Sequence, residues 1–293
     1  MKAREMIDII AVVFCLACPA KAETNNSAVL QLPEVIVAET RFHEESPVGP
    51  YQQPEWTEHR RFPSTRVYLQ DPPWNMEFEQ WGRWQKFRDG SSAYLFQEEA
   101  TLGLPHRFQF DLYDNWTTAD NGNTKEDSIA TELRYAFADW GEIPLNPTLY
   151  LEYKFGINKT DAGEAKILLG DQLAPRWHWG VNLFVEQETS GEESTETGIS
   201  AALAYTVVDQ ELSFGVEMEY AQESVKYERS DPEKELLIGP SVQWRPVPRI
   251  HIDAVPMFGI TNDAPRIELW VVLGYDFGSL KPSGIIPKAS ESR

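Results

Sequence analysis

The sequence predicts an all-β fold, a closed antiparallel transmembrane β-barrel of about 12 strands that covers residues 74–277. Two observations predict it. Apolar and polar side chains alternate with a period of two along many segments, and the connections between these segments alternate between short and long. Beyond the N-terminus no run reaches the roughly 18 apolar residues of a spanning helix, so any passage through a membrane has to be made by strands.

The clearest alternation lies in residues 211–221, ELSFGVEMEYA. Every second residue from Leu212 to Tyr220 is apolar, and the positions between them hold Ser, Gly or Glu. Because successive side chains of a strand point to opposite faces, this segment has one apolar face and one polar face. Residues 148–157 and 267–277 repeat the pattern, which a helix would scatter around its axis.

The same pattern gives an even number of strands, as bacterial single-chain barrels have. The candidate strands are residues 75–87, 92–103, 106–116, 127–140, 147–158, 164–173, 176–188, 196–208, 211–223, 235–246, 249–260 and 265–277. Outer-membrane barrels have tight periplasmic turns and longer external loops. Short connections here are 103–106, 141–146, 174–175, 209–210 and 246–248, and they alternate with longer polar ones at 117–126, 159–163, 189–195 and 224–234.

A secreted soluble β-sandwich is the alternative fold, because its strands alternate as well. Strand length favours the barrel, since segments of about 10 to 13 residues match a tilted span of the bilayer and average strands have about 5 to 6. Aromatic residues also recur near strand ends, where an interfacial girdle is expected. They are Trp116, Trp140, Trp177, Trp179, Trp244, Tyr275 and Phe277.

The N-terminus has the features of a secretory signal peptide over residues 1–22. A basic start is followed by an apolar run and by a small-x-small site that predicts cleavage after Ala22. A lipid anchor on Cys18 is the alternative. Cys15 and Cys18 are the only cysteines, so a chain cleaved at Ala22 has neither disulfides nor thiol chemistry.

The regions that flank the predicted barrel lack its alternation. Residues 23–73 are rich in Glu, Pro, Ser and Gln, and we expect them to form a flexible periplasmic leader. Residues 278–293 follow the last predicted strand, and we expect them to form a periplasmic tail.

Two stretches resemble a known group of proteins. Residues 96–116, FQEEATLGLPHRFQFDLYDNW, and the ending IELWVVLGYDFG are similar to small bacterial outer-membrane barrels of the transporter-like or phenol-degradation-pathway type. The resemblance implies an outer-membrane location, with membrane lipid, lipopolysaccharide and the barrel-assembly machinery as partners. Barrels of this group often end at the final aromatic residue, whereas sixteen residues follow Phe277 here.

One piece of the leader resembles the energy-coupling box of TonB-dependent receptors. It lies in LPEVIVAETRF and is carried by Glu34–Ala38. Such a box adds an extended strand to the sheet edge of a periplasmic partner, for which β-branched residues in a free tail are suited. The alternative is a chance β-rich segment, because those receptors have a plug domain and a far larger barrel than this chain can form.

The polar faces of the predicted strands give a candidate lumen in which acids outnumber bases. We expect the lining to be Arg107, Asp111, Glu132, Arg134, Glu152, Lys154, Glu186, Glu217, Glu219, His251, Asp253, Arg266, Glu268 and Asp276. This predicts a narrow passive channel or transporter for small solutes, with a bias toward cations or neutral molecules. The alternative is a structural or surface-binding barrel without a conducting pore, whose lumen is filled by ion pairs.

Other functions have little support in the sequence. A net charge of −20 without a basic patch argues against binding of nucleic acid. Neither G-x-S-x-G nor H-E-x-x-H occurs, and we expect neither an enzyme nor a cofactor. His251 and Asp253 lie two residues apart on one face, as do Glu217 and Glu219, a spacing that suits acid–base work or a weak metal site. We interpret both pairs as structural.

Overall fold

The computed structural model describes residues 42–120 and 122–279. The chain divides into two units, residues 1–40 and 41–293, and only the second contains described residues. The predicted signal peptide, the TonB-box-like Glu34–Ala38 and the tail from residue 280 onward lie outside the described residues, so these predictions stay predictions.

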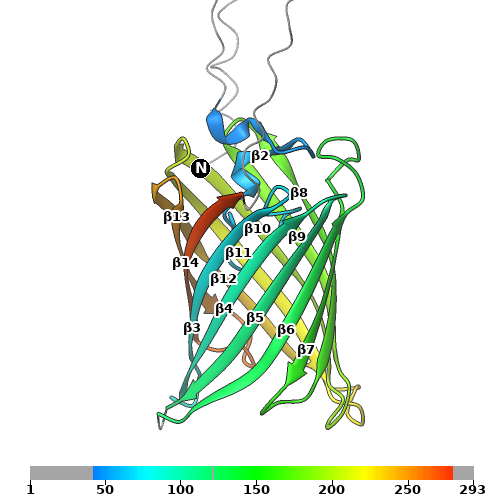
Figure 1. The fold of residues 1–293 in the computed structure, drawn as a ribbon. Helices are drawn as coiled ribbons and strands as arrows, with labels where there is room; N and C mark the ends of the chain where they lie inside the picture. Colours follow the sequence, from blue (N-terminus) through cyan, green and yellow to red (C-terminus); the bar gives the residue numbers. More distant parts are fainter. Residues whose placement is uncertain (1–41, 121, 280–293) are drawn as a thin grey trace, which may run out of the picture. The chain divides into compact units, whose positions relative to one another are not determined.

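Twelve antiparallel strands form a closed barrel, as predicted, in which each strand pairs with the next and the last pairs with the first (Figure 1). The strands are β3 (Asn75–Lys86), β4 (Ser92–Leu104), β5 (Phe108–Ala119), β6 (Thr124–Ala136), β7 (Thr148–Gly156), β8 (Ala162–Ala174), β9 (Trp177–Glu188), β10 (Thr195–Val208), β11 (Leu212–Ser224), β12 (Glu233–Val247), β13 (Ile250–Gly259) and β14 (Ile267–Ser279). We call the end where β3 begins and β14 ends the entry end, and the opposite end the far end.

The connections differ from the predicted loops in one respect at each end. At the far end, residues 120–123 join β5 to β6, because polar residues beyond the expected strand ends continue the ladder as far as the pair Thr118 and Thr124. At the entry end, residues 137–147 form a longer connection than the expected 141–146, since β6 stops at Ala136. The connections at the two ends of the barrel therefore differ in length less than the sequence predicts.

The outer face of the barrel is apolar. Large side chains that alternate with buried ones are exposed along the strands, among them Leu151, Leu183, Phe214, Val216, Leu273 and Phe277. A closed sheet leaves no edge unpaired, and such an apolar belt needs lipid around it. The closed barrel with its apolar outer face is thus a membrane-spanning β-barrel. Among the described residues, no helix is long and apolar enough to cross a membrane.

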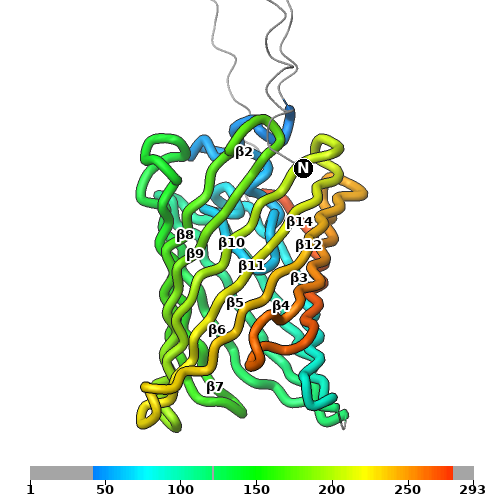
Figure 2. The backbone as a smooth tube through the Cα atoms, turned by 180° about the vertical axis from the view of Figure 1, so that it is seen from behind, coloured from blue at the N-terminus to red at the C-terminus, as the bar shows by residue number. Residues whose placement is uncertain are grey.

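Residues 42–73, which we call the plug segment, begin at the rim of the entry end and run from there into the barrel (Figures 1 and 2). This differs from the flexible leader that their composition predicts. The segment holds two short 3₁₀ turns, η1 (His43–Glu45) and η2 (Glu55–Thr57), and a two-residue ladder of β1 (Pro47–Val48) with β2 (Gln53–Pro54). It stays in place through contacts with the wall, which a composition-based expectation does not take into account.

An apolar core forms between the plug segment and the wall. Its buried members are Tyr51, Trp56, Phe62, Val67, Tyr68, Leu69, Ala136, Ala202 and Ala204. Trp56 is fully buried and stacks on His178 of β9, with ring centroids 4.5 Å apart. Trp140 meets Trp56 and Tyr68 edge-to-face, so it belongs to this core and not to the lipid girdle predicted for it.

Two glycines in the wall make room for the plug segment. Gly170 of β8 and Gly180 of β9 are paired across the sheet. A Cβ atom added at either would come within 2.6 or 2.7 Å of a methyl group of Val67. These positions need glycine because the plug segment occupies the volume of their missing side chains.

Candidate functional site

Wall side chains satisfy the backbone of the plug segment, which has little secondary structure of its own. Asn182 of β9 accepts from the Arg66 amide at 2.7 Å and donates to the Arg66 carbonyl at 2.8 Å. Gln109 accepts from the Gln70 amide at 2.6 Å, and Gln243 donates to the carbonyl of His59 at 2.6 Å. A buried backbone group without a hydrogen-bond partner costs free energy. These amide side chains supply the partners, and the irregular segment can therefore be buried inside the barrel.

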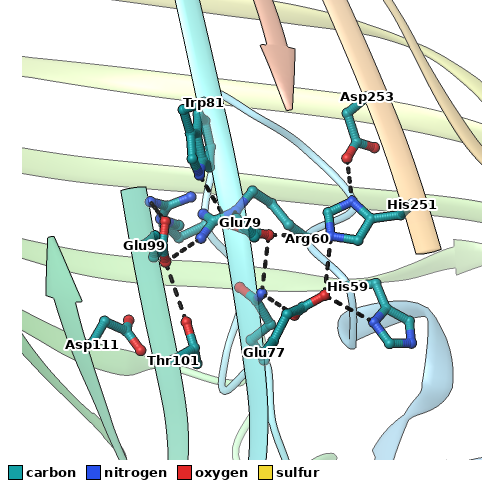
Figure 3. A network of polar contacts seen from close by, with 12 residues as sticks. His59, Arg60, Glu77, Glu79, Trp81, Glu99, Thr101, Asp111, His251 and Asp253 are labelled. Atoms are coloured by element: carbon teal, nitrogen blue, oxygen red, sulfur yellow. Dashed lines mark hydrogen bonds and ion pairs between the residues drawn. The ribbon is translucent and has the colours of Figure 1, made fainter. Parts of the chain in front are cut away.

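A layer of buried charges lies deeper in the lumen (Figure 3). Arg60 of the plug segment donates to Glu79 at 2.6 Å and to Glu99 at 2.5 Å. Its guanidinium also lies 4.4 Å from the ring centre of Trp81. Arg66 lies 3.6 Å from Glu99, on the same indole. Arg60 and Arg66 therefore each meet wall acids, whereas Arg61 pairs with Glu44 of the plug segment.

A second group of charges belongs to the wall alone. Arg134 of β6 pairs with Asp111 of β5 at 3.1 Å and with Glu132. Tyr113 donates a hydrogen bond to Glu132. All of these side chains are buried, so each charge depends on its partners, and removal of one partner leaves another charge unpaired in a low dielectric.

Toward the far end the lumen contains a cavity of about 590 Å³. Pro63, Ser64 and Arg66 of the plug segment line it on one side, and its lining extends to Lys159 and Thr160 in the far-end connection from β7 to β8. Eight acidic and five basic side chains line it. Within the plug segment, by contrast, lies a void of about 10 Å³, which is the size of one water molecule, and Arg134 of the wall closes it.

The structure brings most of the predicted lining residues into the lumen, at two depths. One group is buried within the charged packing, namely Asp111, Glu132, Arg134, Glu217, His251 and Asp253, whereas Glu268 is buried nearer the far end, where Gln85 donates to it at 2.5 Å. A second group lines the far-end cavity, namely Glu152, Lys154, Glu186 and Glu219. Within the second group, Lys154 pairs with Glu186 at 2.5 Å.

Two predicted lining residues, both arginines, lie elsewhere. Arg107 is in the turn between β4 and β5 with φ +64°, where it pairs with Asp139. Arg266 is exposed in the connection between β13 and β14. Asp276, near the end of β14, stays on the inward face that holds Gly274, and its charge acts on Glu58 of the plug segment. Strands β5 and β14 each begin two residues later than predicted, and this moves both arginines out of the lumen.

Sequence reasoning missed the residues that hold the plug segment. Glu77 and Glu79 on β3 and Glu99 on β4 are at most 1% exposed. The signal was present, since Glu77, Glu79 and Trp81 alternate with Phe78 and Gln80. The other signal was the excess of lumen acids over bases, which Arg60, Arg61 and Arg66 of the presumed leader partly balance.

Two acidic side chains of the plug segment, Glu58 and Asp71, have raised pKa values. Burial, together with the charges of Glu55 and Asp276, raises the pKa of Glu58 to about 8. Burial also raises the pKa of Asp71 well above its usual range, with the charges of Glu77 and Glu58 adding to the effect. Both carboxyls thus favour the protonated form more than a free side chain does.

Comparison with known proteins supports the fold. No protein-family model matches the chain, and no curated protein matches it. Among solved structures, an outer-membrane channel from Pseudomonas putida F1 superposes with a TM-score of 0.51 at 9% identity, over 72% of this chain and 98% of that chain. The NanC porin superposes with a TM-score of 0.50 at 11% identity, over 71% of this chain and all of the porin, 100%. At these identities the likeness shows a common fold, that of outer-membrane β-barrels.

Proposed function

We propose that the chain is a channel for small solutes whose plug segment is its gate. The observation that carries this proposal is the far-end cavity of about 590 Å³, in which plug residues Pro63, Ser64 and Arg66 take part. A solute that enters from the far end meets this segment before it can cross. Passage then requires residues 42–73 to shift or leave.

The attachment of the plug segment is compatible with a gate. Its contacts with the wall are hydrogen bonds, ion pairs and apolar packing, such as the 2.6 Å bond from Ser64 Oγ to Glu217. A single hydrogen bond contributes about 1 kcal/mol net, and such contacts re-form when the segment returns. Many of the wall side chains that face the plug segment are polar, such as Gln109, Asn182 and Gln243, and water can solvate them when the segment moves.

The charges of the cavity suggest a bias among solutes. With eight acids against five bases, the lining attracts cations more than anions. We expect the conducting form to be cation-selective, so that in a KCl gradient its reversal potential shifts toward the equilibrium potential of K⁺. An anion-selective current would contradict the assignment of this lining to the pathway.

Conductance of the full mature chain in planar bilayers tests the gate. Thr65 of the plug segment and Ser200 of β10 have hydroxyl oxygens 3.1 Å apart, so paired cysteines there suit a disulfide. With Thr65→Cys and Ser200→Cys together, discrete current steps should disappear on oxidation and return on reduction. Each single variant is the control. Steps that persist in the oxidised pair would refute the gate, and wild-type protein without steps would refute the channel.

A barrel without a conducting pore is the second candidate, and the closely packed plug segment favours it. In that case the cavity is a binding vestibule, and neither the reduced pair nor the wild type conducts. The same bilayer experiment separates the two functions.

The position of the plug segment suggests how a partner would open it. The TonB-box-like residues Glu34–Ala38 lie only a few residues before its first residue in sequence. A periplasmic partner that adds this strand to its own sheet and pulls would draw on residues 42–73. If a partner pulls the segment out, a thiol reagent should label Thr65→Cys in energised cells. Val35→Pro removes a backbone donor from the added strand, so we expect it to abolish this labelling while leaving the purified protein's conductance unchanged. Equal labelling would contradict this route.

A further inference from the structure

Three buried side chains of the wall, Glu77, Glu79 and His251, each place one possible metal-ligand atom within 4.8 Å of the other two. His251 Nε2 lies 3.0 Å from Glu77 Oε1 and 3.3 Å from Glu79 Oε1 (Figure 3). The three residues are at most 2% exposed. Ligand atoms around a tetrahedral zinc ion with bonds of about 2.0–2.1 Å lie about 3.3–3.4 Å apart, close to this spacing. We propose that Glu77, Glu79 and His251 bind one divalent transition-metal ion, for which zinc is the probe.

The imidazole of His251 is oriented as in metal sites. Its Nδ1 lies 2.5 Å from Asp253 Oδ2, so Asp253 accepts the Nδ1 proton and leaves the lone pair on Nε2. Nε2 is buried and has no hydrogen-bond partner of acceptable geometry. A carboxylate behind a histidine is the usual way in which proteins fix a metal-binding tautomer. The unpartnered nitrogen, aimed at two carboxylates, is what an ion at this point would satisfy.

The far oxygen of each carboxylate is also held. Gln70 donates to Glu77 Oε2 at 2.6 Å. Glu79 Oε2 accepts from Arg60 at 2.6 Å and from Trp81 at 3.0 Å. These bonds turn the remaining oxygens, both Oε1, toward His251. Such outer partners raise metal affinity because the ligands need little reorganisation on binding.

Two plug residues contact the proposed ligand oxygens directly. His59 Nδ1 lies 3.1 Å from Glu77 Oε1, and Gln70 Nε2 lies 3.2 Å from Glu79 Oε1. An ion would take over these oxygens while Gln70 and Arg60 continue to hold the far ones. Metal affinity and the position of the plug segment are therefore linked, and by reciprocity the ion affects how firmly the segment is seated.

The wall leaves space for the histidine ring. Gly274 of β14 is paired with His251 on one side and with Glu79 on the other. A Cβ atom at Gly274 would lie 1.7 Å from His251 Nε2, so the imidazole crosses the position of a missing side chain to reach β3. The ligands thus come from two strands, β3 and β13, on either side of a glycine.

Equilibrium dialysis of the refolded, chelator-treated mature chain against Zn²⁺, followed by metal analysis, tests the site. We expect one equivalent of zinc in the wild type and none in His251→Ala. Asp253→Asn, which changes the tautomer and not a ligand, should weaken binding about 10–100-fold. The matched control is His106→Asn, at an exposed turn position with φ +63° that asparagine tolerates. It should keep the full equivalent.

A gel shift between boiled and unboiled samples shows which variants are folded. If His251→Ala does not fold, Glu77→Gln serves instead, because the amide keeps the shape and loses the charge. Substoichiometric zinc in the wild type overturns the proposal, as does equal binding in a folded His251→Ala or Glu77→Gln. Loss in these variants with retention in His106→Asn supports it. The absorption spectrum of bound Co²⁺ adds the coordination number.

Discussion

Glu98 of β4 and Asp114 of β5 lie directly opposite one another in the ladder, on the lipid-facing side of the barrel. Glu98 shares its face with exposed Tyr94 and Phe96, and Asp114 shares its face with exposed Leu112. Gln80 of β3 is the next residue in the same row. Elsewhere this belt is largely apolar. Two acids that face each other in lipid repel one another and lose hydration, so they destabilise the barrel.

We therefore expect Glu98→Leu and Asp114→Leu each to raise the free energy of unfolding, by about 1–2 kcal/mol. The measurement is denaturant unfolding in lipid vesicles. Glu99 is the matched comparison, since it is adjacent in sequence but faces Arg60 in the lumen. Glu99→Leu should lower stability by about 3–5 kcal/mol because Arg66 then loses its acid partner and buried Arg60 keeps Glu79 alone. A loss of stability in Glu98→Leu would show that this acid has a partner in the membrane.

The fit of Val67 against Gly180 gives a second prediction. A Cβ atom at Gly180 would lie 2.7 Å from one methyl of Val67 and 3.0 Å from that of Thr65, both on the plug segment. Gly180→Ala should lower stability by about 1–3 kcal/mol, and Val67→Ala in the same chain should restore part of the loss. Gly163→Ala is the control, since its nearest neighbour would be 3.9 Å away. Additive effects of the two substitutions in a double-mutant cycle would argue against this contact.

The barrel could be predicted from sequence because lipid imposes strict alternation. The residues from Leu212 to Tyr220 show it without exception, and the register of β11 keeps them on one face. Strand ends are less well determined, because polar residues pair equally well beyond the membrane. Arg107 and Arg266 were misplaced for that reason, although each lies within two residues of a strand.

The plug segment could not be predicted, since its order depends on residues distant in the chain. Arg60 meets Glu99 across 39 positions, and Ser64 meets Glu217 across 153. Its apolar residues have no period because they pack on an irregular path. The charges were the one available signal. The predicted lumen has an excess of acids, and the arginines of the predicted leader could have balanced it from inside the barrel. Only part of the cluster around His251 could be predicted from the sequence. Asp253 lies on the same strand as His251, whereas Glu77 and Glu79 come from another strand.

Trp56 distinguishes a seated plug segment from a free leader. It is fully buried against His178, so Trp56→Ala should lower the free energy of unfolding by about 3–5 kcal/mol. A flexible leader would show no change. Tyr227→Ala is the control, since Tyr227 is 89% exposed in a connection and should be neutral. Denaturant unfolding measures both, and equal midpoints for Trp56→Ala and the wild type would refute the seated segment.

The carboxyl of Glu58 makes the seating of the plug segment depend on pH. Its pKa is raised from an ordinary 4.5 to about 8 in the folded chain, mainly by burial. The folded state therefore holds a proton that the unfolded state releases between these values. This contribution to stability is fully present below about pH 4.5 and is lost as the pH rises through about 8.

We expect the denaturation midpoint of the wild type to fall between pH 5.5 and 8.5, and to fall less in Glu58→Gln, which is neutral throughout. Some pH dependence should remain, because Asp71 has a raised pKa of the same sign. Glu228→Gln, at an exposed position in the connection from β11 to β12, should behave as the wild type. Equal slopes in wild type and Glu58→Gln would show that Glu58 is solvated and charged. If Glu58 is protonated as expected, alkaline conditions loosen the gate by charging an acid that has Glu55 and Asp276 as neighbours.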